Sequence, residues 1–216
     1  MIHELVQQNS LASQFIAELR DAAVQTDRLR FRKNMERLGS VMAYEISKIL
    51  PYEIKSITTP LGIKEMNVLA EQPVIATILR AGLAMHQGFL DFFDQADNAF
   101  ISAYRKHEKD GSFVIALEYV SCPDLNDRIL IVNDPMLATG ASMVVTMKEL
   151  FKLGHPRHTH IVCAIASSEG IEYVRSNLQN ITIWTGAVDE ELTAKGYIVP
   201  GLGDAGDLAF GEKIQE

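Results

Sequence analysis

The sequence predicts an α/β fold, with a mostly parallel, doubly wound sheet in a single domain over residues 1–216. Three observations predict it. Apolar strand-like segments alternate with segments of helical spacing along most of the chain. The segments 74–79 and 129–132 are aliphatic or β-branched throughout, which is typical of strands buried on both faces. Each of them runs into a glycine-containing turn and then a helical pattern, where open α/β sheets bind ligands.

The N-terminal part predicts a helical arm. Apolar residues recur every three or four positions over residues 10–23, and again over 35–49 before Pro51 stops the pattern. A polar, basic segment at residues 25–33 separates them. The strands expected next cover residues 54–58, 65–69 and 74–79, and a helix is expected over 83–93.

The middle of the chain predicts a protruding β-hairpin. Its strands are expected over 100–104 and 113–120, and the charged run 105–111 is typical of an exposed tip. After the strand 129–132, helices are expected over 143–153 and 170–177, and strands over 160–166 and 181–188. The tail 197–211 is rich in glycine and acid and has no periodic pattern.

Composition narrows the possible functions. The net charge of −8 and the lack of a basic stripe disfavour nucleic-acid binding. No apolar run approaches the roughly 20 residues of a membrane span, and the N-terminus lacks a signal layout, so a cytoplasmic protein is expected. Two cysteines are too few for a disulfide framework. His155, His158 and His160 are expected in a solvated loop and not at a metal.

The most informative stretch is residues 129–142, ILIVNDPMLATGAS. It places the carboxylate of Asp134 at the end of a buried strand. Thr139 and Ser142 add hydroxyls, and Gly140 leaves room for backbone N–H groups to surround an anion at a helix start. The spacings of a P-loop and of GxGxxG are both absent from this stretch. An acid followed by an anion cradle fits a sugar bearing a phosphate and a diol, although turn geometry alone would also explain the Asp-Pro and Thr-Gly pairs.

Four loops carry a family resemblance: ILRAG at 78–82, YR at 104–105, DPMLATGAS at 134–142 and YIVPGLGDAGD at 197–207. Together they resemble the uracil phosphoribosyltransferase family, and the match extends over roughly the whole chain from residue 20. The resemblance implies the type I phosphoribosyltransferase fold with a C-terminal base-binding segment. It also implies transfer of ribose 5-phosphate from phosphoribosyl diphosphate (PRPP) to N1 of uracil, giving UMP and diphosphate, with Mg²⁺ held mainly through PRPP and no protein-bound metal.

The resemblance also implies the site residues. Catalytic roles fall on Asp134, Arg80 and Arg105. PRPP binding is expected from Arg80, Arg105, Asp134, Pro135, Met136, Leu137, Ala138, Thr139, Gly140, Ala141, Ser142 and Asp204. Uracil binding is expected from Ile198, Gly203, Asp204 and Ala205.

Three residues depart from the family pattern. Asn133 replaces a usually apolar residue, Ala141 a usual glycine, and Leu208 a usual basic residue. They keep open the alternative of a catalytically weakened, PRPP- or UMP-binding regulatory paralogue. A regulator that acts on RNA or a partner protein is a further alternative. Transfer to another base is less favoured, because purine enzymes usually carry an acid where this chain has Ala138.

Assembly and control are implied more weakly. The long amphipathic N-terminal helix and the family pattern lead us to expect a homodimer or a larger homo-oligomer. The basic cluster within residues 28–33 is expected to be a solvated face or a subunit contact, with a GTP effector site as the alternative.

Overall fold

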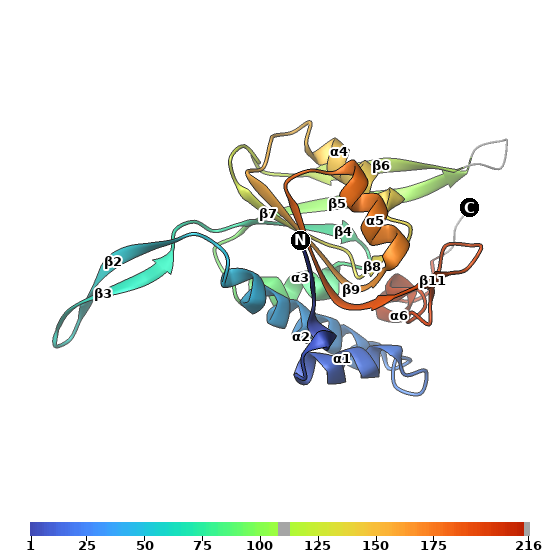
Figure 1. Cartoon of the computed structure of the whole chain (residues 1–216), viewed down its shortest axis with the longest axis horizontal. Coiled ribbons are helices and arrows are strands. Elements are labelled where there is room, and N and C mark those ends of the chain that lie inside the picture. The colour runs from blue at the N-terminus through green and yellow to red at the C-terminus, as the bar shows by residue number, and fades with distance from the viewer. Residues whose placement is uncertain (108–112, 214–216) are drawn as a thin grey trace.

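A mostly parallel sheet forms the centre of the molecule (Figure 1). The computed structural model describes residues 1–107 and 113–213. The strand order is β1-β10-β9-β7-β4-β5-β6, with β8 beside β9, and every neighbouring pair is parallel except β5 and β6. The strands of this sheet are β1 (Ile2–Glu4), β4 (Val74–Leu79), β5 (Asp97–His107), β6 (Phe113–Ser121), β7 (Ile129–Asn133), β8 (Met136–Leu137), β9 (His158–Ser167) and β10 (Ile181–Asp189).

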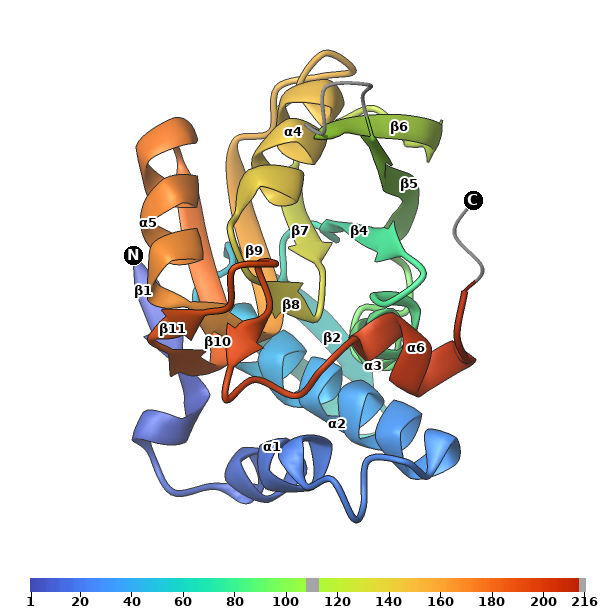
Figure 2. The ribbon, with the colours of Figure 1, turned by 90° about the vertical axis from the view of Figure 1, so that its right-hand side faces the viewer.

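Helices cover both faces of the sheet, as the doubly wound prediction requires (Figure 2). They are α1 (Leu11–Arg20), α2 (Arg28–Ser47), α3 (Leu83–Leu90), α4 (Ala141–Leu150), α5 (Ser168–Asn177) and α6 (Ala205–Phe210), with a short 3-10 turn η1 (Leu5–Gln7). Two small antiparallel pairs lie outside the main sheet: β2 (Tyr52–Thr59) with β3 (Gly62–Leu69), and β11 (Glu191–Leu192) with β12 (Ile198–Val199).

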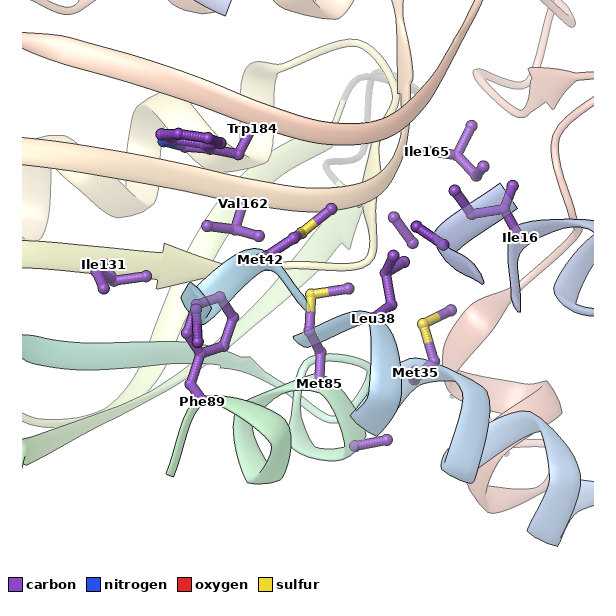
Figure 3. Close-up of a cluster of buried hydrophobic side chains, with 14 of the residues drawn as sticks. Ile16, Met35, Leu38, Met42, Met85, Phe89, Ile131, Val162, Ile165 and Trp184 are labelled. Atoms are coloured by element: carbon purple, nitrogen blue, oxygen red, sulfur yellow. The ribbon is translucent and has the colours of Figure 1, made fainter. Parts of the chain in front are cut away.

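The central strands divide their side chains between two cores because successive residues of a strand point to opposite faces. Ile131 and Val162 pack with α1, α2 and α3, together with Met42, Met85 and Phe89 (Figure 3). The next residues along each strand pack with α4 and α5 in a second cluster. The uninterrupted aliphatic runs of β4 and β7 therefore follow from burial on both faces.

The order of the strands fixes where the site forms. β4 lies between β7 and β5, so the chain leaves β4 in one direction to reach β5 and must cross β4 to form β7. The loops that follow β4 and β7 therefore emerge side by side at a topological switch point, where α/β sheets bind ligands. Arg80 begins the first loop and Asp134 the second.

The N-terminal helices begin at polar caps. The Ser10 hydroxyl accepts a hydrogen bond from the Ala12 amide at the start of α1. The Asp27 carboxylate accepts one from the Arg30 amide, so α2 begins at Arg28. Most of the basic segment expected before the helix is thus its first turns.

The β2–β3 hairpin stands away from the body of the molecule (Figure 1). It exposes apolar side chains, with Ile54 69%, Leu61 100% and Ile63 76% accessible. The sequence predicted only two short strands here, because neither face of the hairpin is buried and the alternation of polar and apolar residues is weak. In the hairpin of β5 and β6, the part of the charged tip at residues 108–112 lies outside the described residues.

Two short parts of the fold were not anticipated, and one expectation was wrong. The tail contains a strand, β12, and a helix, α6, which are too short for a periodic pattern to reveal. The N-terminal residues form β1, which pairs with β10. His158 and His160 belong to β9 and not to a solvated loop, and His160 is buried. In the part of the chain that the structure describes, no helix is long and apolar enough to span a membrane.

Two glycines allow α2 and α3 to pack backbone to backbone. A Cβ on Gly88 would collide with the carbonyl oxygen of Glu36, and a Cβ on Gly39 would collide with that of Met85. The Ser40 hydroxyl donates to the Gly88 carbonyl at 3.2 Å across the same interface. The Arg80 turn leads directly into α3, so this contact supports the site.

We predict that Gly88→Ala destabilises the protein by about 1–3 kcal/mol because backbone atoms cannot move aside for the methyl group. In an exposed helix the same change stabilises by up to about 1 kcal/mol. Chemical denaturation measures the difference. Gln87→Ala, at an exposed neighbouring position on α3, is the control and should leave stability nearly unchanged. A Gly88→Ala protein as stable as the wild type would contradict the close packing.

Candidate active site

A cavity of about 240 Å³ opens at the carboxyl ends of the parallel strands. Its wall combines the loop after β7 with the C-terminal tail, which are separated by more than 50 residues in sequence. Its lining residues are Ala81, Asp134, Met136, Leu137, Ala138, Thr139, Gly140, Ser142, Met143, Gly196, Tyr197, Ile198, Gly203, Asp204, Ala205, Gly206 and Lys213. Most residues expected to bind PRPP, and all those expected to bind uracil, therefore lie around one space.

The loop after β7 is held in place by main-chain hydrogen bonds to β9. The Asp134 amide donates to the Val162 carbonyl at 3.0 Å. The Pro135 carbonyl accepts from the amides of Ala164 and Ile165 at 2.9 and 3.0 Å. β8 then continues the pairing along β9. Pro135 faces this contact and is buried away from the cavity, while the Asp134 side chain remains at the cavity wall.

The residues that follow form the start of α4. Gly140 has φ +76°, and a Cβ there would approach the Gly170 carbonyl oxygen to 2.8 Å, so the position requires glycine. The Thr139 hydroxyl accepts a hydrogen bond from the Ala141 amide at 3.4 Å. Because Gly140 and Ser142 line the cavity, the positive end of α4 forms part of its wall. The arrangement is suited to binding a phosphate.

Ser167 and Gly170 support this loop, and the sequence analysis gave them no role in the site. The Ser167 hydroxyl donates to the Ala138 carbonyl at 2.5 Å and accepts from the Gly170 amide at 2.8 Å. A Cβ on Gly170 would collide with the Ala138 carbonyl oxygen. The only sequence signal was the capping position of Ser167 before a helix, which does not reveal a contact 29 residues away.

The tail forms the opposite wall. Ile198 is buried on β12, and the turn that follows is fixed by Asp189, whose carboxylate accepts from the Gly201 amide at 2.9 Å. Arg20 pairs with Asp189 at 2.7 Å and also donates to the Gly201 carbonyl at 2.9 Å. Asp204 then caps α6 by accepting from the Asp207 amide at 3.0 Å. These contacts bring Gly203, Asp204 and Ala205 to the cavity.

The cavity holds two carboxylates and one cation among its described lining residues. Burial raises the pKa of Asp134 to about 7; the Met136 amide opposes this, and the negative charge of Asp204 adds to it. The Lys213 ammonium lies 3.7 Å from the Asp204 carboxylate. Sequence patterns did not reveal Lys213, because it lies beyond the last motif, which ends at Asp207.

Arg80 lies beside the cavity and not in its lining. Its guanidinium pairs with the Asp207 carboxylate at 2.9 Å and donates to the Gly211 carbonyl at 3.2 Å. A Cβ added to Gly206, a lining residue, would be 3.9 Å from the guanidinium, which places Arg80 at the rim. The Leu79–Arg80 peptide bond is cis. Arg105 lies on β5 opposite Ile115, and its side chain is outside the described part of the structure.

The three departures from the family pattern have different structural settings. Ala141 is the first residue of α4 and has no positive φ, so it avoids the backbone cost of replacing a left-handed glycine. Leu208 packs against the core beneath the tail. Asn133 is fully buried and hydrogen-bonded to β4.

The basic cluster at the start of α2 already has partners within the chain. Arg30 pairs with Glu18 at 2.7 Å, and Lys33 with Glu36 at 2.8 Å. Arg32 donates to the Ala209 carbonyl at 2.7 Å and so links α2 to α6. The cluster therefore helps to hold the tail.

We predict that Asp134→Asn makes the protein more stable above pH 7. A carboxyl whose pKa is raised in the folded state favours folding at low pH, and this advantage is lost as pH rises towards about 7. The amide does not ionise, so the variant should exceed the wild type by about 1–3 kcal/mol at pH 8 and by little at pH 4. Denaturation at both pH values measures this, with the exposed Asp94→Asn as control. Equal pH slopes for wild type and Asp134→Asn would rule out the raised pKa.

Comparison with known proteins agrees with this architecture. The sequence model of the uracil phosphoribosyltransferase family matches residues 6–212. A Porphyromonas gingivalis protein named uracil phosphoribosyltransferase is 51% identical over 208 residues, 96% of each chain. A Pyrococcus furiosus protein of the same name is 37% identical over 205 residues, 94% of this chain and 87% of its own.

Solved structures extend the likeness to the fold. A protein of Aquifex aeolicus superimposes with a TM-score of 0.87 at 33% identity, covering 100% of both chains. A Staphylococcus aureus hypoxanthine phosphoribosyltransferase gives 0.51 at 9% identity, over 74% of this chain and 76% of its own, and so shares the fold alone. The motifs, the fold and the cavity agree with the family match, and the chain belongs to the uracil phosphoribosyltransferase family.

Proposed function

We propose that this cavity transfers ribose 5-phosphate from PRPP to N1 of uracil, giving UMP and diphosphate. Family membership supports the reaction. The observation that carries the proposal is the meeting of three parts around one space: the Asp134 carboxylate, the phosphate cradle at the start of α4, and the tail at Ile198 to Ala205. A phosphorylated sugar and a flat base would need these parts side by side.

The cradle would bind the 5-phosphate. The first amides of α4 have no partner within the helix, and they can donate to phosphate oxygens beside the Thr139 and Ser142 hydroxyls. Asp134 would accept hydrogen bonds from the ribose hydroxyls, and its negative charge would stabilise the positive charge that develops at the anomeric carbon. The anomeric carbon–oxygen bond to diphosphate breaks, the bond to N1 forms, and diphosphate leaves with the electron pair.

The tail would recognise uracil. The Ile198 carbonyl can accept from an N–H of the base, and the amides near Gly203 and Ala205 can donate to its carbonyl oxygens. Gly203 lines the cavity and has φ +94°, a conformation that favours glycine. Ala138 offers no acid to take the N1 proton, so the proton would pass to water and catalysis would rest on positioning and leaving-group stabilisation.

The diphosphate would leave on the side of Arg80. A planar guanidinium can bind two phosphate oxygens at once, and Arg80 lies at the rim with a partly exposed side chain. Binding would exchange its carboxylate partner Asp207 for the diphosphate. For Arg105 the proposal rests on family resemblance alone: it would close over the diphosphate from the hairpin of β5 and β6 and exclude water.

Mg²⁺ fits this site as an ion held mainly by the substrate. The described residues contain no group of three or more His, Cys, Asp or Glu side chains placed to hold a metal. Asp204 and Asp134 nevertheless lie close enough for one charge to raise the pKa of the other, so the cavity favours a cation. Bound with PRPP, Mg²⁺ would neutralise diphosphate oxygens, with Asp204 holding it directly or through water.

We also propose that the protein is a cytoplasmic homodimer or larger homo-oligomer. The exposed apolar side chains of the β2–β3 hairpin support a subunit contact. GTP control through the basic cluster has less support, because Arg30, Arg32 and Lys33 already have partners in the chain.

The decisive experiment measures UMP formation from uracil, PRPP and Mg²⁺, with cytosine and hypoxanthine as competing bases. We expect turnover with uracil alone, and Asp134→Asn should lower kcat by about 100-fold or more. Denaturation of the same variant at the assay pH separates a loss of activity from unfolding. PRPP binding without turnover on any base would contradict the proposal and favour a regulatory paralogue.

A second prediction concerns Lys213. Its ammonium lies 3.7 Å from the Asp204 carboxylate at the cavity wall, and a polyanionic substrate would gain from this positive charge. Lys213→Ala should therefore raise KM for PRPP by about 3- to 10-fold and leave KM for uracil unchanged. Lys213→Arg should restore most of the affinity. The exposed Lys148→Ala is the matched control. An unchanged KM for PRPP in Lys213→Ala would exclude Lys213 from the site.

A further inference from the structure

A polar cluster is buried at the carboxyl ends of β4 and β7, next to the two loops that lead to the cavity. It consists of Thr77 on β4, Asn133 on β7 and His86 on α3, which are 0%, 0% and 4% exposed. We call these three residues the buried polar cluster. None of them lines the cavity, but Asn133 immediately precedes Asp134 and Thr77 lies three residues before Arg80.

The cluster joins the two strand ends through side-chain hydrogen bonds. Thr77 and Asn133 are register partners in the β4–β7 ladder. The Thr77 hydroxyl donates to Asn133 Oδ1 at 3.1 Å, and Asn133 Nδ2 donates to the Ala76 carbonyl at 2.9 Å. Asn133 Nδ2 also lies 3.5 Å from His86 Nδ1, which acts as an acceptor there. Asn133 therefore contacts β4 and α3 from β7.

The turn that contains Arg80 packs against the buried polar cluster. A Cβ on Gly82 would lie 2.8 Å from Asn133 Oδ1 and would collide with the Thr77 hydroxyl. The Arg80–Gly82 turn therefore packs directly on these two polar atoms. Ala81, in the middle of that turn, lines the cavity. A change in the cluster would be transmitted to both loops, because the first loop packs on it at Gly82 and the second begins directly after Asn133.

His86 extends the cluster towards a third strand. His86 Nε2 and Asn98 Oδ1 are both buried without a hydrogen-bond partner among the described residues. Burial lowers the pKa of His86, and the side chain of Asn98 on β5 opposes this shift. A neutral His86 with its proton on Nε2 fits an acceptor at Nδ1 towards Asn133 and a donor towards Asn98. The cluster thus lies among β4, β5 and β7.

Burying an amide and a hydroxyl costs free energy unless each has partners, and an apolar side chain of the same size would fill the space without that cost. Hydrogen bonds have directional preferences that apolar contacts lack, so they fix distances between the elements they join. We propose that Asn133 is a positioning residue, which through Thr77 and Gly82 holds the Arg80 turn and Asp134 at the separation that PRPP requires. This inference rests on the proposed function.

The test is a double-mutant cycle in UMP synthesis, with Thr77→Val and Asn133→Leu as near-isosteric changes. Asn133→Leu should lower kcat by about tenfold or more, because small displacements of reacting groups are costly. KM for uracil should stay within about twofold, since the hydrogen bonds of the cluster join β4, β7 and α3 and not the tail. The double variant should be no worse than Asn133→Leu alone, because both changes break the same contact. If Asn133→Leu folds poorly, Thr77→Val tests the inference alone: it should lower kcat and leave KM for uracil unchanged, and a wild-type kcat would overturn the inference.

Trp184→Phe is the matched control. It removes another buried side-chain hydrogen bond, from Trp184 Nε1 to His160 Nδ1 at 3.2 Å, outside the cavity lining. It should lower Tm without changing kcat. The inference is overturned if Asn133→Leu keeps the wild-type kcat, if the single effects are additive, or if Trp184→Phe loses as much kcat for the same loss of Tm. Wild-type turnover is measured first, so a failure of the proposed reaction is distinguished from a failure of this inference.

Discussion

The site depends on one constraint: after Asn133 the chain leaves β7 but must keep its pairing with β9. The Asp134 amide and the Pro135 carbonyl make this pairing, and β8 continues it. The Asp134 carboxylate is thereby fixed at the carboxyl end of the central strand β7, and the residues that follow it run towards α5. There Ser167 and Gly170 contact the Ala138 carbonyl, and the chain continues to Gly140 at the start of α4. Without the pairing to β9, neither the acid nor the cradle would have a fixed place.

The sequence predicted the parts of this fold that depend on local pattern. The aliphatic runs predicted the bounds of β4 and β7 to within one residue, because strands buried on both faces consist almost entirely of apolar residues. The motifs gave the loops that line the cavity. What the sequence left out depends on contacts between distant segments: Ser167 beneath Ala138, Lys213 beside Asp204, and Arg32 holding α6. Arg32 holds α6, and β12 is held by its pairing with β11, while the residues of these two short elements show no periodicity.

The cations around the cavity are paired with carboxylates, and an anionic ligand can take the place of each carboxylate. Arg80 is held by Asp207, and Lys213 lies near Asp204. Both cations are at least partly exposed, so each pair contributes little to folding stability and is readily exchanged for a more highly charged anion. Asp134 differs, because burial and Asp204 favour its neutral form. A bound cation or a developing positive charge would favour its ionised form.

The two walls of the cavity rest on the hydrophobic cores in different ways. Ile198, Leu202 and Ala205 of the tail pack with the core of α1, α2 and α3. In the other wall, Leu137 and Met143 pack with the core of α4 and α5, while Met136 and Ala138 contact the first core. The sheet separates the two cores, so a change in the packing of one is poorly transmitted to the other. The wall that would face the base can therefore diverge during evolution while the phosphate wall is retained. Such a division lets one sugar-phosphate scaffold acquire new base preferences by a few substitutions on one side of the sheet.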